Sequence, residues 1–327
     1  MRMESDTFDE LDLRLLDALE VNGRASFSRI GAVLGVSDQT VARRYRRLCA
    51  EGGLRVVAVR DAAALGQDQW TLRLRCVPDS ALAIADALAK RSDTSWIGLA
   101  AGGTEVIFGT RPRSPGDRDD LLLGKLPRTP RVLEIHAHQI LHRFYGGPNG
   151  WLRKFRVLSD DQVAALRPDH GPASPGPARI DPEDEPLLAV LERDGRAGHP
   201  ELQRATGRSE SAVRRRLSAL LASGAVYIDV EYHSEILGYP TAAVLWLTTG
   251  PAELHRVGEA LAAHDEIAHA AATAGPSNIV ATAVVRSTAH LYAYLSGPLG
   301  RLEGVQHVEA SPFLRRVKQL TYPRPVR

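Results

Sequence analysis

Apolar residues recur at helical spacing near the start of the chain. Leu11, Leu15, Leu16 and Leu19 form one stripe of a predicted helix over residues 9–20. A second short helix is predicted from Ser26 to Gly35, and Ser37 is the expected N-cap of a third that ends near residue 51. Short helices with a glycine in the turn before the last one are typical of a helix-turn-helix.

Beyond residue 66 the pattern changes to the alternation that strands produce. Strands are predicted over 70–77, 94–100, 105–110 and 132–141, with helices over 79–90 and 118–126. The glycines at 102 and 103 separate the second strand from the third as a hairpin. The order strand-helix-strand-strand-helix-strand predicts a ferredoxin-like βαββαβ domain.

The second half of the chain repeats the first at an offset of 172 residues. Asn22-Gly23-Arg24-Ala25 falls on Asp194-Gly195-Arg196-Ala197, and the same shift aligns Asp12 with Asp184 and Arg43-Arg44 with Arg215-Arg216. The predicted fold is therefore α+β. It has two winged or tri-helical helix-turn-helix domains, each followed by a ferredoxin-like sandwich of the RAM or AsnC type.

The expected boundaries follow from this repeat. Helix-turn-helix domains are predicted over 8–56 and 179–229, ferredoxin-like domains over 66–145 and 238–320, and a linker over 146–178. The stretch from Arg167 to Pro182 contains five prolines and is poor material for a packed element.

Charge and cysteine content exclude several classes of protein. The 327 residues carry 41 basic and 39 acidic side chains, so any affinity for nucleic acid must be local. Cys49 and Cys76 are the only cysteines, which excludes a disulfide framework and a CxxC metal knuckle. We expect a cytoplasmic protein, because the sequence shows no secretory signal and no apolar run long enough to span a membrane.

The third helix of the first half concentrates cations on one side. Val41, Tyr45 and Leu48 form its apolar stripe, with Arg44 at the edge of the stripe. Gln39, Thr40, Arg43, Arg46 and Arg47 are predicted to face outward. The second copy has a different outward set, namely Ser211, Arg214, Arg215 and Arg216.

These residues of both copies, Arg44 included, are predicted to contact double-stranded DNA. A helix fits the major groove, where arginine binds guanine and glutamine binds adenine through two hydrogen bonds. The alternative is a merely solvated basic surface. Because the second copy lacks the glutamine and two of the arginines, it is expected to read another sequence or chiefly phosphates.

The first copy resembles the Lrp/AsnC family of transcription regulators in the motifs LDLRLLDALEVNGRAS, GVS and TVARRYRRLCAEG. The second copy resembles this family more loosely. The resemblance implies an amino-acid-sensing and oligomerisation role for the ferredoxin-like domains. It also implies an effector site at a Gly-x-x-Asp hairpin, matched here by Gly102, Gly103 and Glu105, and by Gly275 and Asn278. Neither copy keeps the aspartate, and a simple hairpin turn is the alternative. Two assemblies fit the resemblance: one chain acting as its own dimer, or a homo-oligomer of chains.

Other functions have weaker support in the sequence. Glu134, His136 and His138 alternate along one predicted strand and His142 follows, but no metal site is expected, since histidines on a sheet face are commoner than ligands. The motifs GxSxG, GxxxxGK[ST], GxGxxG and HExxH are absent, so no catalytic residue and no cofactor are predicted. The predicted double-unit fold also resembles that of the siroheme decarboxylases, so catalysis of that type is the alternative function.

Overall fold

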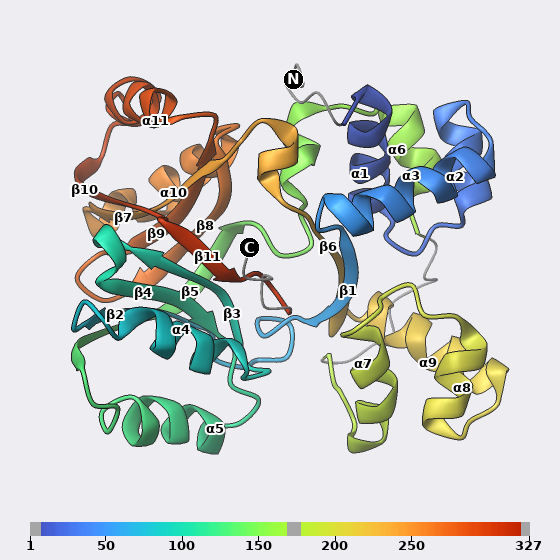
Figure 1. The fold of residues 1–327 in the computed structure, drawn as a ribbon, viewed down its shortest axis with the longest axis horizontal. Coiled ribbons are helices and arrows are strands. Elements are labelled where there is room, and N and C mark those ends of the chain that lie inside the picture. Colours follow the sequence, from blue (N-terminus) through green and yellow to red (C-terminus); the bar gives the residue numbers. More distant parts are fainter. Residues whose placement is uncertain (1–7, 169–177, 322–327) are drawn as a thin grey trace. The chain divides into compact units, whose positions relative to one another are not determined.

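The structure is a computed structural model that describes residues 8–168 and 178–321. The chain divides into two compact units. One contains the residues up to Leu65 together with Gly147–Gly238, and the other contains Gly66–Gly146 together with the residues from Tyr239 on (Figure 1). Each unit thus combines corresponding parts of the two sequence repeats.

The helices are α1 Glu10–Val21, α2 Phe27–Leu34, α3 Asp38–Glu51, α4 Ala81–Ala89, α5 Pro115–Asp119, α6 Asp160–Leu166, α7 Glu185–Leu191, α8 His199–Thr206, α9 Glu210–Ala222, α10 Leu254–Ala263 and α11 Thr288–Tyr294. The strands are β1 Arg55–Arg60, β2 Trp70–Cys76, β3 Thr94–Ala100, β4 Glu105–Thr110, β5 Val132–Tyr145, β6 Val226–Glu231, β7 Thr241–Thr249, β8 Ile267–Ala274, β9 Ile279–Val285, β10 Val305–Pro312 and β11 Arg315–Lys318. Short π-helical turns extend α5 and α11 through Asp120–Lys125 and Leu295–Leu299.

The first unit holds both helix-turn-helix modules. Helices α1, α2 and α3 form the first around Leu16, Ile30 and Leu48, which are fully buried. Helices α7, α8 and α9 form the second around Leu188, Leu202 and related apolar residues. Strands β1 and β6 take the place of the wings and pair with each other in antiparallel register, from Arg55 opposite Glu231 to Arg60 opposite Val226. This ribbon was not expected from the sequence.

The predicted linker over 146–178 differs from what the structure shows. Trp151–Phe155 forms a 3₁₀ turn and α6 follows it, and both pack on the first module. The Asn22 side chain donates to the Leu166 carbonyl at 3.0 Å, and Gln162 donates to the Val33 carbonyl at 2.9 Å. Residues 169–177, where the predicted linker is richest in proline, lie outside the described part of the chain.

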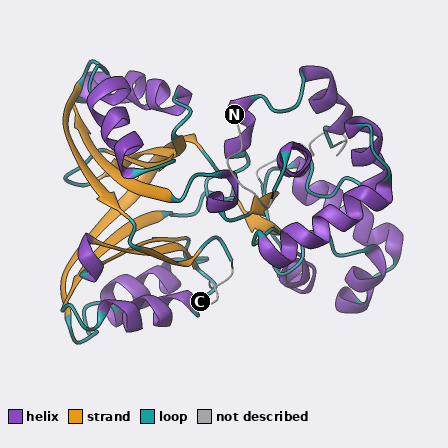
Figure 2. Ribbon diagram, turned by 45° about the horizontal axis from the view of Figure 1, so that its top comes forward, coloured by secondary structure: helices purple, strands orange, loops and turns teal. Residues whose placement is uncertain are grey.

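The second unit contains both ferredoxin-like domains, as predicted. Their strands form one sheet in the order β10-β7-β9-β8-β5-β2-β4-β3-β11, with the helices on its outer sides (Figure 2). Strand β5 pairs with β2 of its own repeat along its first half and with β8 of the other repeat along its second half. Only Phe313 and Leu314 separate β10 from β11. Strand β10 pairs with β7 of its own repeat, and β11 pairs with β3 of the other repeat, just as β5 pairs with a strand of each repeat.

Three apolar clusters lie among the described residues of this second unit. One lies between α4 and the first four-stranded half of the sheet, and another lies under α10 and α11. A third joins the two repeats and is built from Ala100, Ile107, Val244, Trp246, Ala271 and Val280. This cluster and the pairing of β5 with β8 join the two ferredoxin-like domains of one chain into a pseudo-dimer.

Candidate nucleic-acid interface

Helix α3 is held in place by local signals that the sequence carries. The Ser37 hydroxyl accepts a hydrogen bond from the Thr40 amide at 3.1 Å, which caps the helix. Gly35 has φ 73°, a left-handed conformation that glycine adopts without strain, and it makes the turn between α2 and α3. Val41 and Leu48 are buried, so the helix presents its opposite side to solvent.

The outward side of α3 contains part of the predicted set. Gln39, Arg43 and Arg46 are exposed, and Thr40 is half-exposed. Arg46 donates to the Ala42 carbonyl of its own helix at 3.2 Å. Among the described residues, no hydrogen bond or ion pair engages the Arg43 guanidinium. These side chains are therefore available to bases and phosphates.

Arg44 and Arg47 are a correction to the sequence prediction, because both are bound to acids of their own module. Arg44 lies 2.6 Å from Asp9 and 3.0 Å from Asp12, whose side chain is fully buried. Arg47 forms an ion pair with the other oxygen of Asp12, and its guanidinium lies over the Phe8 ring. A buried carboxylate needs such partners, so these arginines stabilise the module and are not free to read DNA.

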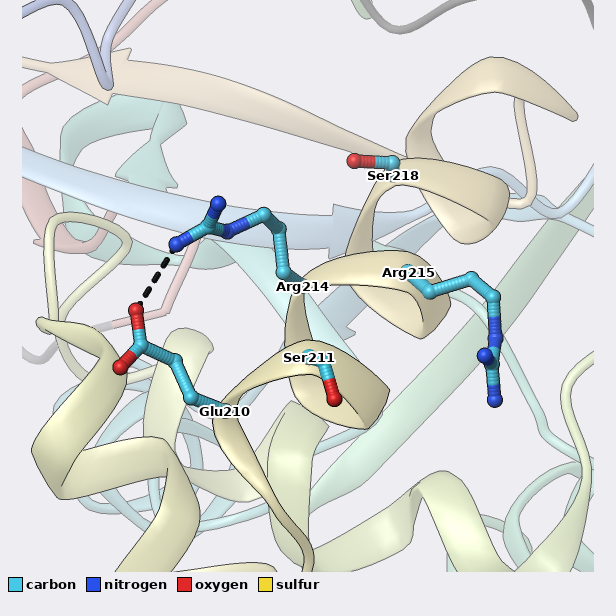
Figure 3. Close-up of a pocket in the computed structure, with 5 residues that line it drawn as sticks. All are labelled: Glu210, Ser211, Arg214, Arg215 and Ser218. Carbon is cyan, nitrogen blue, oxygen red and sulfur yellow. Dashed lines mark hydrogen bonds and ion pairs between the residues drawn. The ribbon is translucent and has the colours of Figure 1, made fainter.

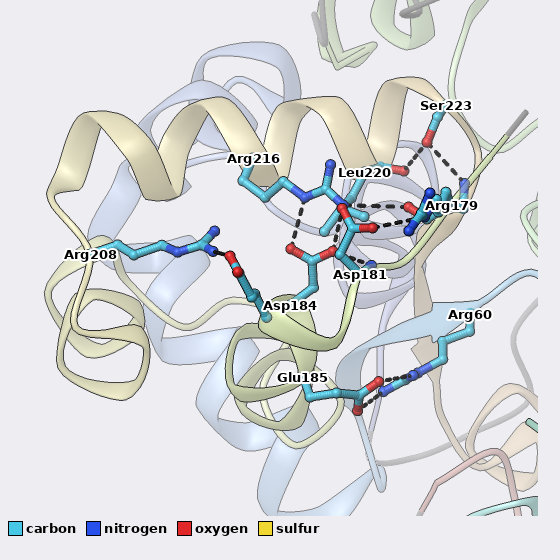
Figure 4. Close-up of polar contacts among 11 residues, drawn as sticks. Arg60, Arg179, Asp181, Asp184, Glu185, Arg208, Arg216, Leu220 and Ser223 are labelled. Carbon is cyan, nitrogen blue, oxygen red and sulfur yellow. Dashed lines mark hydrogen bonds and ion pairs between the residues drawn. The ribbon is translucent and has the colours of Figure 1, made fainter. Parts of the chain in front are cut away.

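The second module repeats this arrangement with Arg216. Its Nε donates to one oxygen of buried Asp184 at 2.8 Å, and its Nη2 forms an ion pair with the other oxygen and lies 3.0 Å from Asp181 (Figure 4). Burial acts to raise the pKa of Asp184, but the hydrogen bonds from Arg216 outweigh it and hold that pKa below its usual value. Arg216 thus belongs to the internal network and is also removed from the predicted DNA-binding set.

The outward face of α9 carries the remaining predicted residues. Glu210, Ser211, Arg214, Arg215 and Ser218 line a shallow hollow on this helix (Figure 3). Arg214 is paired with Glu210 one turn earlier at 2.8 Å, and both are largely exposed. Arg215 extends away from that pair. An exposed pair of this kind is weak, so both Arg214 and Arg215 remain usable for phosphate contacts.

The turns that follow α1 and α7 join the two modules, which the sequence reading missed. Arg24 donates to the carbonyls of Gly195 and Ala197, and Arg196 donates to those of Gly23 and Ala25. A Cβ on Gly23 would lie 2.6 Å from Ile228 of β6, so only glycine fits that approach. The signal was present, since the Gly-Arg-Ala triplet recurs in both halves, but it served only to mark the repeat.

A further ion pair crosses between the halves along the ribbon. Arg60 of β1 lies 2.7 Å from Glu185 at the start of α7 (Figure 4). It also lies 2.8 Å from Glu192, just after the end of that helix. These ion pairs, the β1–β6 ribbon and the hydrogen bonds of Arg24 and Arg196 hold the two helix-turn-helix modules, and with them α3 and α9, in one unit.

The two hairpins predicted to bind an effector are already occupied by contacts within the protein. Glu105 is buried, and its carboxylate accepts hydrogen bonds from Arg73 at 2.8 and 2.9 Å. The Asn278 side chain bridges the backbone of Thr249. Gly102 and Gly103 have left-handed φ values of 67° and 87° and form the turn, while Gly275 lies against His138. Because these side chains are already engaged, an effector contact at these loops would have to use backbone groups, and it stays a prediction.

The alternating residues Glu134, His136 and His138 do not share one environment. Glu134 pairs with Arg75 at 3.1 Å, whereas His138 is buried beside the Trp246 ring. Burial lowers the pKa of His138, so its neutral form is favoured.

Family models match three segments of the chain. Residues 8–48 match the AsnC-type helix-turn-helix domain, residues 184–227 match a winged helix-turn-helix DNA-binding domain, and residues 242–323 match the Lrp/AsnC ligand-binding domain. A helix-turn-helix transcriptional regulator of Pyrococcus furiosus is 30% identical over 146 residues, which are 98% of that protein and 44% of this chain. The chain belongs to the Lrp/AsnC family.

Another relative extends this comparison of the Lrp/AsnC-family chain. The transcriptional regulator LrpA of Pyrococcus horikoshii is 28% identical over 140 residues, which are 99% of that protein and 42% of this chain. Each of these two relatives is thus matched along almost its whole length by less than half of this chain, as a double-unit family member requires.

A solved structure shares the double-unit fold. The siroheme decarboxylase NirDL superposes with a TM-score of 0.63 over 96% of this chain and 94% of its own, at 13% identity. At that identity the likeness concerns the fold alone. Among the described residues, no helix is long and apolar enough to cross a bilayer.

Proposed function

We propose that this chain is a DNA-binding transcription regulator of the Lrp/AsnC type that contacts duplex DNA through the outward faces of α3 and α9. The contact residues are Gln39, Thr40, Arg43 and Arg46 on α3, and Ser211, Arg214 and Arg215 on α9. The observation that carries the proposal is the division of the arginines. Those paired with Asp12 and Asp184 brace each module, while Arg43, Arg46 and Arg215 extend outward from it.

The proposal gives the two modules different roles. Helix α3 offers a glutamine and two outward arginines, which suit base edges in the major groove. Helix α9 offers serines beside Arg214 and Arg215, which suit phosphates. Because both helices are fixed in one unit, a single chain presents two unlike reading surfaces.

The ferredoxin-like unit supplies regulation in this proposal. A small metabolite, such as an amino acid, would bind there and shift the chain between two states of different DNA affinity. The same unit would also bring chains together as a homo-oligomer in the cytoplasm.

Replacing Arg43 with Ala tests the DNA contact. We expect operator binding to weaken by about 1–3 kcal/mol, with relaxed preference at one base position, if Arg43 reads a base. The measurement is a shift assay on genomic target sites at fixed salt, because phosphate contacts make affinity salt-dependent. Arg301→Ala removes an exposed arginine of the other unit and is the matched control. Equal binding by both variants and the wild type would overturn the orientation assigned to α3.

The likeness to NirDL keeps an enzyme as the second candidate. A tetrapyrrole carries several carboxylates, whereas the interior arginine Arg73 is already matched by Glu105 at 2.8 Å and Glu309 at 2.6 Å. This charge balance opposes such a ligand. Purified protein mixed with an iron porphyrin should therefore show no shifted absorbance band, and a saturable shift would favour the enzyme.

A further inference from the structure

Three metal-binding side chains from two different repeats converge in the second unit. They are His142 on β5 of the first ferredoxin-like domain, and His255 and Glu259 on α10 of the second. Their ligand atoms all lie within 4.8 Å of one another, and all three residues are exposed. The regulatory function assigned above uses none of them.

The helix side of this cluster is built by its spacing and by one glycine. His255 and Glu259 are four residues apart on α10, so they lie on the same face of the helix. Gly258 stands between them in the sequence, and a Cβ there would lie 2.1 Å from the Phe144 ring of β5. The missing side chain lets the helix approach the strand closely enough for both ligands to reach His142.

The strand side is built by an irregularity in β5. Its pairing with β8 shifts register between Ile140 and His142, which is the mark of a β-bulge. Ile140 packs in the apolar cluster between the two repeats, whereas Phe144 packs in the cluster under α10. A bulge changes which face the following side chains take, so His142 and Phe144 turn toward the helix.

The three side chains have no other task in the described part of the chain. No hydrogen bond or ion pair engages any of them there, and the two histidines make ring contacts. The His142 ring lies 4.8 Å from that of Phe144 and 6.0 Å from that of His255. A cation would therefore not have to break an existing pair.

We propose that His142, His255 and Glu259 bind a divalent transition-metal ion of the zinc type. Two imidazoles and one carboxylate are a ligand set that Zn²⁺ takes, with water as the fourth ligand. Ligand distances of about 2.0–2.2 Å need the ligand atoms to lie about 3.4 Å apart, which small side-chain rotations at an exposed site can achieve. Imidazole ligands favour Zn²⁺, Ni²⁺, Co²⁺ and Cu²⁺ over Mg²⁺ and Ca²⁺.

The bound ion would link the two repeats across the β5–β8 junction. His142 comes from the first repeat, and His255 and Glu259 come from the second. The ion would therefore strengthen the pseudo-dimer of ferredoxin-like domains. The site uses none of the residues assigned to the Gly102 and Gly275 hairpins and would provide a second kind of input to the same unit. This inference does not depend on the DNA contacts.

The test is titration of the full-length, tag-free protein with Zn²⁺ alone after treatment with a chelator, followed by calorimetry. We expect one ion per chain, and tetrahedral absorption bands when Co²⁺ is used instead. His255→Ala should weaken binding on the order of tenfold or more, since even loss of an outer-shell partner has an effect of about that size. Glu259→Gln keeps the size of the side chain and should also weaken it.

His136→Ala is the matched control, because it removes an exposed histidine from the same strand. Its affinity should equal that of the wild type, and circular dichroism should show that every variant is folded. The proposal is overturned if His255→Ala binds Zn²⁺ with the affinity of the wild type. It is also overturned if His136→Ala lowers the Zn²⁺ affinity as much as His255→Ala does. The assay contains no DNA, so its failure leaves the regulatory function untouched.

Discussion

Neighbouring arginines on α3 have opposite roles, and the reason lies in where the buried carboxylates are. Asp12 is fully buried, and Arg44 and Arg47 both contact it, while Arg43 and Arg46 point to solvent. Removal of one partner from a buried ion pair typically destabilises a protein by about 3–5 kcal/mol. Variants of Arg44 are therefore unsuitable for measuring DNA contacts, since they affect folding first.

Glu20 is a second residue whose surroundings decide its charge. Removal from water raises the pKa of its carboxyl to about 8, although the Tyr232 hydroxyl donates to it at 2.8 Å. The folded state therefore holds a proton that the unfolded state has released between about pH 4.5 and 8. The stability from this group is complete below that window and is lost as pH rises through it.

Glu20→Gln should flatten this dependence. Urea denaturation between pH 5 and pH 8 should show a smaller loss of unfolding free energy in the variant, with the difference at most on the order of 4 kcal/mol. Glu10→Gln changes an exposed carboxylate of the same helix and should follow the wild type. If Glu20→Gln showed the wild-type slope, Glu20 would be ionised in the folded protein.

At the level of elements, the turns after α1 and α7 and the β1–β6 ribbon hold the helix-turn-helix modules together. The two turns are not equivalent, because Arg196 also lies over the rings of Phe27 and Tyr45, at 4.7 and 5.4 Å. The second copy has His199 and Leu217 at the positions that correspond to those aromatic residues. Arg196 therefore has cation–π contacts in addition to its hydrogen bonds.

Arg24→Ala and Arg196→Ala should destabilise the first unit to different extents. Each leaves two backbone carbonyls without their donor, which lowers the unfolding free energy by about 1–3 kcal/mol. We expect the larger loss for Arg196→Ala in urea denaturation, because the cation–π contacts are lost as well. Lysine at either position should not restore stability, since it lacks the planar fork of arginine. A larger loss for Arg24→Ala would contradict this account.

At the level of the whole molecule, the duplication places two unlike reading helices on one chain. Gln39 and Arg46 of α3 correspond to Ser211 and Ser218 of α9, so the two surfaces differ, while the pairs Arg44–Asp12 and Arg216–Asp184 occupy equivalent positions. The buried aspartate and one arginine bound to it recur in both copies, whereas two of the outward positions have diverged. A regulator of this kind suits an operator with two different halves.

Arg43→Ala and Arg215→Ala should therefore affect different parts of one operator. Footprinting should show protection lost over one half-site for Arg43→Ala and over the other for Arg215→Ala. The losses in binding free energy should be nearly additive in the double variant, because the sites share no contacts. Loss of protection over the same bases in both variants would show that only one module meets DNA.

Much of this protein follows from local sequence signals. Ser37, Gly35 and the stripe of Val41 and Leu48 specify α3 without help from the rest of the chain, because capping and amphipathic spacing act within a few residues. The same holds for the ferredoxin-like order of strands and helices, and the repeat predicted both copies. The residues that were assigned correctly to the outward face of α3 depend only on this periodicity.

What the tertiary structure decided are the contacts between distant segments. The periodicity of α3 placed Arg47 outward and left Arg44 at the edge, but it could not reveal that Asp9 and Asp12 meet them 35 residues away. It also could not reveal that β1 would pair with β6, or that a bulge in β5 would turn His142 toward α10. Such pairings depend on which surfaces the folded chain brings together, since local propensity fixes an element but not its partner.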